Sequence, residues 1–172
     1  GTMLAWLYFV RPTYSIAIVA VLLLLASLRK WRSLAITAAA GAGWLMGFVL
    51  FSQHYYHTYL PPYYQLSRLR FPPMATALLG NLVSPSRGLF VYMPCALVVV
   101  VAISFAWWRM PDRWLALIAL ASVATHLVAI SGFHPWWGGY SYGPRLMMGA
   151  LPWLVMLSIQ AMATAGRALF VI

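Results

Sequence analysis

The chain has 172 residues, of which 64% are hydrophobic and only 7% are charged, and its mean hydropathy is +0.85. Soluble globular domains carry about 25% charged residues, so this composition excludes that class and predicts an integral membrane protein. Eleven Lys and Arg against one acid give a net charge of +10, which indicates contact with anionic headgroups or anionic substrates. Because the basic residues are scattered among apolar segments and form no continuous stripe, we expect no nucleic-acid partner.

Hydrophobic runs divide the chain into membrane helices and short connections. The runs cover residues 3–10, 13–28, 33–52, 89–107, 114–131 and 146–165. The first run is too short to cross a bilayer, which takes about 20 helical residues, and we interpret it as the end of a truncated helix. We therefore expect an all-α, polytopic transmembrane helix bundle with about four full spans plus a partial N-terminal helix. Residues 1–172 would form a single transmembrane domain, a fragment of a longer multi-pass protein of the inner (plasma) membrane.

Basic connections between the runs determine the expected orientation. Arg29, Lys30 and Arg32 form one basic turn, and Arg109 and Arg113 lie in a second turn on the same predicted side. Short basic turns favour the cytoplasm, so the opposite loops are predicted to be extracytoplasmic. That outer face then carries five arginines and no acid, which suggests an anionic ligand. These arginines are Arg11, Arg68, Arg70, Arg87 and Arg145.

Residues 53–87 form an interfacial segment rich in Tyr and Pro, which is typical of an aromatic belt at the membrane surface. Within it, residues 74–83 are predicted to form a short amphipathic or re-entrant helix. His54 and His57 have a spacing that puts both rings on one face of a helix. Two ligands do not make a metal site, so we expect no metal there.

The stretch from Trp136 to Arg145 reads Trp-Trp-Gly-Gly-Tyr-Ser-Tyr-Gly-Pro-Arg and separates two hydrophobic runs. Its glycines allow positive φ angles, and Gly143 with Pro144 ends any preceding helix and can begin the next one. Arg145 then falls in the first turn of a hydrophobic helix, where its charge opposes the helix dipole. A nearby anion would remove this penalty.

Three arginines are candidate phosphate ligands. Arg11, Arg87 and Arg145 each flank a Pro or Gly at the outer end of a hydrophobic run. The planar guanidinium suits phosphate because it donates two parallel hydrogen bonds and keeps its charge. The alternative for each arginine is that its side chain extends to the lipid headgroups.

Aromatic residues supply the other candidate contacts. Trp136, Trp137, Tyr140 and Tyr142 could form a stacking wall for a sugar ring, and His134 precedes that wall. The alternative is a membrane-interface belt. A belt needs no particular backbone path, whereas the glycines between these aromatics indicate one.

The sequence offers no catalytic group on the predicted outer face. Its only carboxylate, Asp112, is assigned to the opposite side as a helix-start residue in contact with Arg109 or Arg113. A general base, a carboxylate pair or a metal triad would need groups that this face lacks. We predict no catalytic residue and no cofactor within this chain.

Three motifs, separated by hydrophobic runs, resemble a known enzyme class. They are Phe-Val-Arg-Pro-Thr at residues 9–13, Ser-Pro-Ser-Arg-Gly-Leu-Phe-Val-Tyr at residues 84–92, and the stretch at residues 136–145. In this order they resemble the C-terminal half of bacterial polytopic glycosyltransferases of the GT-C class. The chain is similar to the protein O-mannosyltransferases and the lipid A aminoarabinose transferase.

The resemblance implies an enzyme that takes a sugar from a polyprenyl-phosphate donor on the extracytoplasmic side. The expected partners are therefore membrane lipids and a lipid-linked sugar donor. The family's catalytic aspartate would lie in a first outer loop nearer the N-terminus, outside this chain. Arg11 matches a basic position that lies near the lipid phosphate in the aminoarabinose transferase. The rival hypothesis is a transporter, a flippase or a structural membrane subunit that handles a lipid-linked anion without chemistry.

Overall fold

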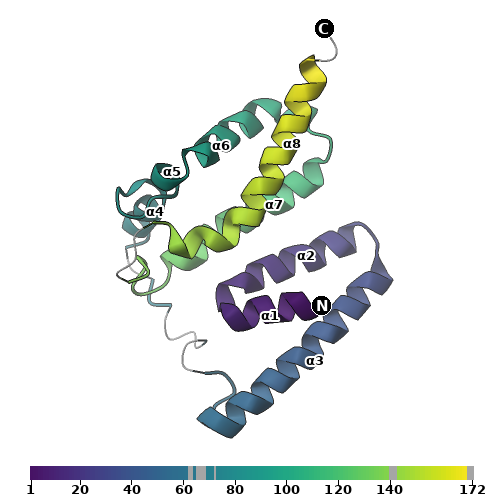
Figure 1. Ribbon diagram of the computed structural model, residues 1–172, viewed down its shortest axis with the longest axis vertical. Helices are drawn as coiled ribbons and strands as arrows, with labels where there is room; N and C mark the ends of the chain where they lie inside the picture. Colours follow the sequence, from purple (N-terminus) through teal and green to yellow (C-terminus); the bar gives the residue numbers. More distant parts are fainter. Residues whose placement is uncertain (62–63, 65–68, 72, 140–142, 170–172) are drawn as a thin grey trace. The chain divides into compact units, whose positions relative to one another are not determined.

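The structure is a computed structural model of the chain and describes residues 1–61, 64, 69–71, 73–139 and 143–169. Within these residues every regular element is a helix (Figure 1), which confirms the predicted all-α class. The chain divides into two compact units, Gly1–Arg70 and Phe71–Ile172. The expectation that residues 1–172 form one transmembrane domain stays a prediction.

Helices form most of the described part of the first unit. These are α1 (Thr2–Val10), η1 (Pro12–Tyr14), α2 (Ser15–Ser27) and α3 (Trp31–Tyr56). Arg11 ends α1 in an extended conformation (φ −154°, ψ 127°), as expected for a residue before proline. Both α1 and α2 pack against α3.

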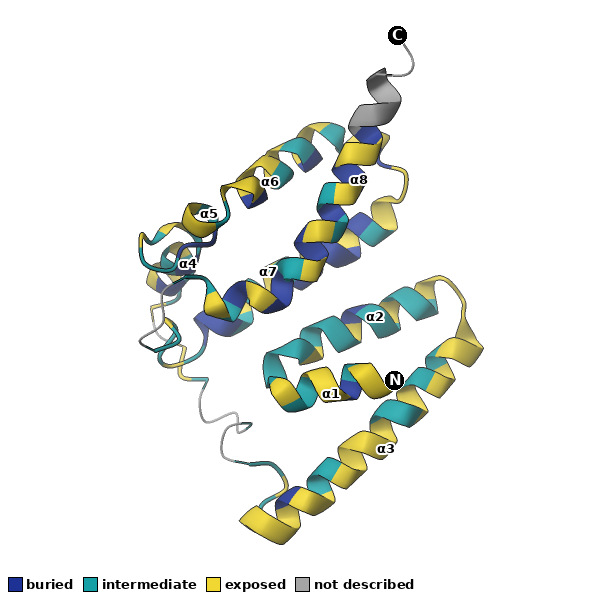
Figure 2. Cartoon of the chain, viewed as in Figure 1, coloured by how far each residue is buried: buried dark blue, intermediate teal, exposed yellow. Residues whose placement is uncertain are grey.

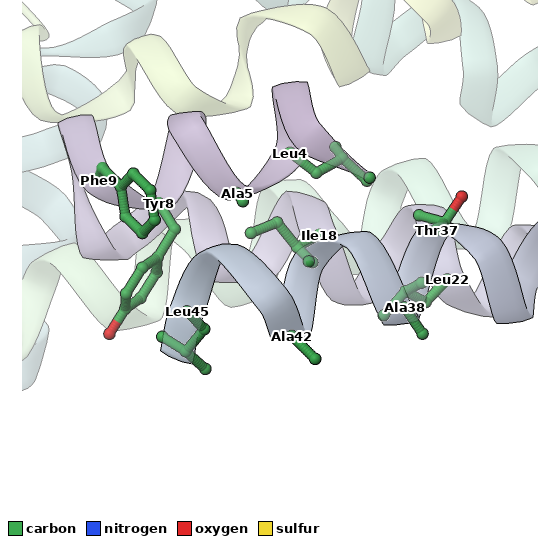
Figure 3. Close-up of a pocket in the computed structure, with 12 residues that line it drawn as sticks. Leu4, Ala5, Tyr8, Phe9, Ile18, Leu22, Thr37, Ala38, Ala42 and Leu45 are labelled. Carbon is green, nitrogen blue, oxygen red and sulfur yellow. The ribbon is translucent and has the colours of Figure 1, made fainter. Parts of the chain in front are cut away.

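The three helices of the first unit surround an apolar pocket of about 440 Å³ (Figure 3). Leu4 and Tyr8 of α1 line it together with Ala38, Gly41 and Ala42 of α3. Small residues often permit close packing of membrane helices. At Gly41, however, an added Cβ would meet no atom within 4 Å, so this residue leaves space at the pocket.

The surface of α3 is apolar and mostly exposed (Figure 2), and Ser52 is its buried residue. Trp44, Met46 and Leu50 are among its exposed apolar side chains. Exposing such an apolar surface to water costs free energy, whereas exposing it to lipid does not. At 26 residues the helix is about 39 Å long, which is enough to cross a bilayer.

The second unit contains the remaining helices. They are α4 (Met74–Val83), α5 (Leu89–Tyr92), α6 (Pro94–Ala106), η4 (Trp107–Arg109), α7 (Arg113–Ser131), η5 (Arg145–Ala150) and α8 (Leu151–Leu169). The run at 89–107 contains Pro94, and a proline inside a continuous helix would produce a kink. The run is broken instead at Met93 (φ −133°, ψ 70°), and Pro94 begins α6 because its missing N–H is tolerated in the first turn of a helix.

Buried side chains in the second unit are concentrated on α7, η5 and α8 (Figure 2). The main apolar cluster joins α5, α6, α7, η5 and α8 through Leu89, Ala96, Ile130, Met147 and Leu154. On the other side of α7, the Asn81 amide of α4 donates a buried hydrogen bond of 3.1 Å to the Ser131 hydroxyl. These contacts hold the ends of α4, α5 and α7 together, next to the candidate site.

The N-terminal end of α7 is fixed by its own cap. Asp112 Oδ1 accepts a hydrogen bond of 3.0 Å from the Leu115 N–H, as a capping carboxylate does. The helix-start role predicted for Asp112 is confirmed. Arg113, an expected partner of that carboxylate, donates to the Trp108 carbonyl and lies 5.3 Å from the centroid of the Trp108 ring.

Three described helices are long and apolar enough to cross a membrane: Trp31–Tyr56, Arg113–Ser131 and Arg145–Thr164. The other apolar helices, Pro12–Ser27, Met74–Val83 and Pro94–Arg109, are shorter. The transmembrane character of the chain is thus supported, while the predicted count of about four full spans is not confirmed.

Candidate ligand site at the glycine-aromatic loop

The glycine-aromatic loop, here residues 134–139 and 143–145, connects α7 to η5. Gly138, Gly139 and Gly143 have φ angles of 72°, 87° and 81°, which L side chains rarely adopt. Gly138 and Gly139 thus adopt the positive φ angles that their sequence allows, and Gly143 does so as well. After Gly143, the Arg145 N–H donates to the Gly143 carbonyl at 2.8 Å and η5 begins.

The arginine turn, residues 84–88, lies between α4 and α5. The Gly88 N–H donates to the Ser84 carbonyl at 2.6 Å, and the Arg87 N–H donates to the same oxygen at 3.2 Å. A Cβ at Gly88 would lie 2.6 Å from the Ser84 nitrogen, so only glycine fits this turn. Leu89 follows directly and is buried in the apolar cluster, which anchors the turn to the core.

Among the described residues, two hydrogen bonds connect the arginine turn to the glycine-aromatic loop. The half-buried Arg87 donates from Nη2 to the Gly139 carbonyl at 3.0 Å, across 52 residues of sequence. Its neighbour Ser86 accepts a bond of 2.9 Å from the Gly143 N–H. Successive residues of the turn therefore hold the loop at Gly139 and at Gly143. We had predicted that both segments belong to a site, but not this connection.

The tryptophans of the loop have different surroundings. Trp136 is half-buried, and its ring lies against α4 so closely that a Cβ at Gly80 would be 2.3 Å from Trp136 Cη2. Trp137 is exposed and meets the Trp136 ring edge-on, with centroids 5.7 Å apart and an interplanar angle of 89°. Trp136 thus packs against α4, whereas the ring of Trp137 is exposed.

His134 and two tyrosines are the other aromatic residues predicted to contact a ligand at this loop. His134 is exposed, and its ring centroid lies 6.0 Å from that of Trp137. Tyr140 and Tyr142 lie outside the described residues. Of the four aromatic residues predicted to form the wall, the structure therefore describes Trp136 and Trp137, and the His134 ring meets Trp137 edge-on.

Arg145 is exposed and is the first residue of η5, as predicted for the start of the helix. The next carbonyl, that of Leu146, lies 2.8 Å from Nε2 of the buried His126 of α7. We did not identify His126 from the sequence, although the polar pair Thr125-His126 interrupts an apolar run. This contact fixes the backbone directly beside Arg145.

Arg11 belongs to the first unit, while Arg87 and Arg145 belong to the second. The half-buried Arg11 is the C-cap of α1, and its N–H donates to the Leu7 carbonyl at 3.1 Å. The role of Arg11 as a phosphate ligand stays a prediction.

The candidate site lies at the opposite end of α7 from the only acidic residue of the sequence. Asp112 caps the start of α7, and a helix of 19 residues is about 28 Å long. No group of three or more metal-ligating side chains occurs among the described residues. The described site presents the exposed Arg145 and Trp137, the half-buried Arg87 and backbone polar groups.

No protein-family model matches the chain, and neither a curated protein nor a solved structure shows significant similarity to it.

Proposed function

We propose that this chain is part of an integral membrane glycosyltransferase of the GT-C class. The enzyme uses a polyprenyl-phosphate-linked sugar donor on the extracytoplasmic face of the inner (plasma) membrane, which the protein crosses several times, with about four full spans in this part. The observation that carries the proposal is a pair of hydrogen bonds between the arginine turn and the loop: Arg87 Nη2 donates to the Gly139 carbonyl, and the Gly143 N–H donates to the Ser86 carbonyl. It joins the two longest motifs that resemble this class.

The chemistry of the described side chains suits a lipid-linked sugar phosphate. Arg145 supplies a permanent charge for the phosphate, and a hydrogen bond to a charged group contributes about 1.5–3 kcal/mol. Trp137 offers an exposed ring for the apolar face of the sugar. The apolar helices around the loop accommodate the lipid chain in the bilayer.

In the proposed reaction the bond between the anomeric carbon and the phosphate oxygen breaks, and a bond from that carbon to the acceptor hydroxyl oxygen forms. Polyprenyl phosphate leaves, and the acceptor proton passes to a general base. Asp112 lies at the other end of α7, so the base comes from outside the described site. A base outside this site agrees with the resemblance, because the family's catalytic aspartate lies in an earlier outer loop.

The test uses the complete protein in proteoliposomes with polyprenyl-phosphate mannose or aminoarabinose and a membrane extract as the acceptor source. We expect protein-dependent release of polyprenyl phosphate and transfer of labelled sugar to the extract. Trp137→Ala should reduce transfer, while Trp114→Ala should not. The matched control, Trp114, is also exposed but lies beside the Asp112 cap at the other end of α7.

The rival function, a transporter, flippase or structural subunit, predicts a different result in the same vesicles. A transporter or flippase moves the intact donor between leaflets without releasing polyprenyl phosphate. A structural subunit shows neither transfer nor movement. Either result would contradict the proposed transferase.

A further inference from the structure

We propose that Arg87 is a positioning residue of the donor site, which holds the glycine-aromatic loop in place rather than binding the donor phosphate. Arg87, Arg145 and Arg11 have the same chemistry and the same sequence context beside Pro or Gly, so the sequence treats them alike. In the structure Arg87 differs from Arg145, because it is half-buried and its Nη2 donates to the Gly139 carbonyl at 3.0 Å.

The described part of the loop needs such support because its glycine backbone has great conformational freedom. Gly138, Gly139 and Gly143 all have positive φ, and glycine loses more conformational freedom on ordering than any other residue. A Cβ at Gly139 would meet no atom within 4 Å, so packing does not fix this residue. The Arg87 guanidinium bonds directly to its carbonyl.

The arginine turn is well placed to restrain the loop. It is closed by the Gly88–Ser84 hydrogen bond and continues into the buried Leu89, so its backbone is anchored. The second bond, from the Gly143 N–H to the Ser86 carbonyl, holds the loop just before Arg145. Through these two bonds the turn determines where Trp137 and Arg145 stand relative to each other.

The first test measures hydrogen exchange of the complete protein in detergent and needs no ligand. Arg87→Gln should speed amide exchange in the peptide covering residues 136–146 by about tenfold or more, since a charged hydrogen bond is lost. Arg109→Gln removes the same charge from an exposed arginine at the other end of α7 and should leave this exchange nearly unchanged. Arg87→Lys retains one donor and should give an intermediate rate.

Unchanged exchange in Arg87→Gln would overturn the proposal. Faster exchange throughout α7 and α8 in both Arg87 variants would also overturn it, because Arg87 would then support the fold as a whole. Arg87→Lys provides the measurement if Arg87→Gln does not fold.

The second test rests on the proposed function and compares two ligands: a polyprenyl-phosphate-linked sugar and the neutral polyprenyl glycoside of the same sugar. A positioning role predicts that Arg87→Gln weakens binding of both ligands by the same factor. Arg145→Gln should weaken only the ligand that carries phosphate. If Arg87→Gln weakened only that ligand, Arg87 would be a direct phosphate contact and the proposal would be wrong. If wild type bound neither ligand while Arg87→Gln still sped loop exchange, the positioning role would stand and the proposed function would fail.

Discussion

The ring of Trp136 lies against the backbone of Gly80, and this contact shows how a single residue of α4 affects the candidate site. A methyl group at Gly80 would lie 2.3 Å from Trp136 Cη2 and 2.5 Å from Cζ3. The ring would have to move, because real Cβ atoms do not approach so closely. Trp137 packs edge-on against Trp136, so that movement would reach the exposed part of the wall.

We expect Gly80→Ala to lower the thermal unfolding midpoint in detergent and to weaken donor binding. Overpacking costs about 1–3 kcal/mol, which exceeds the gain of up to about 1 kcal/mol from replacing glycine in a helix. Gly41→Ala is the matched control, since a Cβ there meets nothing within 4 Å and alanine favours the helix. If both variants melted at or above the wild-type temperature, the contact would not constrain Trp136.

Arg87 and Arg145 illustrate what residue type alone leaves undecided. Both are arginines in Gly- or Pro-flanked turns, and the sequence assigns both to one ligand. Whether a guanidinium bonds to a carbonyl 52 residues away depends on how α4, α5 and α7 pack. The residues around each arginine in the sequence do not determine this packing.

At the scale of single elements, Asp112 and α7 give a direct test of the described helix boundaries. Asp112→Ala should destabilise the protein by about 0.5–2 kcal/mol, because the Leu115 N–H loses its side-chain acceptor. Asp112→Asn should be nearly neutral, since asparagine caps helices about as well as aspartate does. Urea or thermal unfolding of both variants measures the difference. Equal losses for Ala and Asn would indicate that the charge of Asp112 matters and its cap does not.

Helix positions were predicted well where the signal is local. The run at residues 74–83 corresponds to α4 (Met74–Val83), and the run at 114–131 corresponds closely to α7 (Arg113–Ser131). In both cases proline or a capping residue precedes a hydrophobic segment, and these signals act within one turn.

Elements whose form depends on packing were predicted less well. Pro94 indicated a kink, but whether the helix bends or restarts depends on how Leu89 and Ala96 enter the shared core. The run at 146–165 begins as the 3-10 helix η5 and becomes α-helical at Leu151, where Pro152 lies in the first turn of α8. The contact between His126 and the Leu146 carbonyl joins two predicted spans, and no local pattern encodes it.

At the scale of the whole molecule, the orientation of the second unit can be tested by thiol labelling. Arg109 and His134 are exposed at opposite ends of α7 and its connections, so a cysteine at either position can react. The background must carry Cys95→Ala because Cys95 is exposed as well. With an impermeant maleimide on spheroplasts, we expect His134→Cys to be labelled and Arg109→Cys to be labelled only after permeabilisation. The reverse pattern would place the candidate site in the cytoplasm.

The central claim, that the glycine-aromatic loop holds an anionic lipid-linked donor, depends on Arg145. As the exposed first residue of η5, its charge opposes the helix dipole at a cost of about 0.3–1 kcal/mol. A charge-assisted bond to phosphate contributes about 1.5–3 kcal/mol, so a bound phosphate makes the position favourable. An arginine that only extends to lipid headgroups makes no contribution to donor affinity.

The most direct measurement is a titration of the complete protein with the polyprenyl-phosphate-linked sugar, carried out for wild type, Arg145→Lys and Arg145→Ala. We predict that Arg145→Ala raises the dissociation constant by about 10-fold to 150-fold, since about 1.4 kcal/mol corresponds to a factor of ten. Arg145→Lys should raise it less, because lysine keeps the charge and loses the planar fork, and neither variant should change the unfolding midpoint appreciably. Equal dissociation constants for all three proteins would contradict a phosphate site at Arg145.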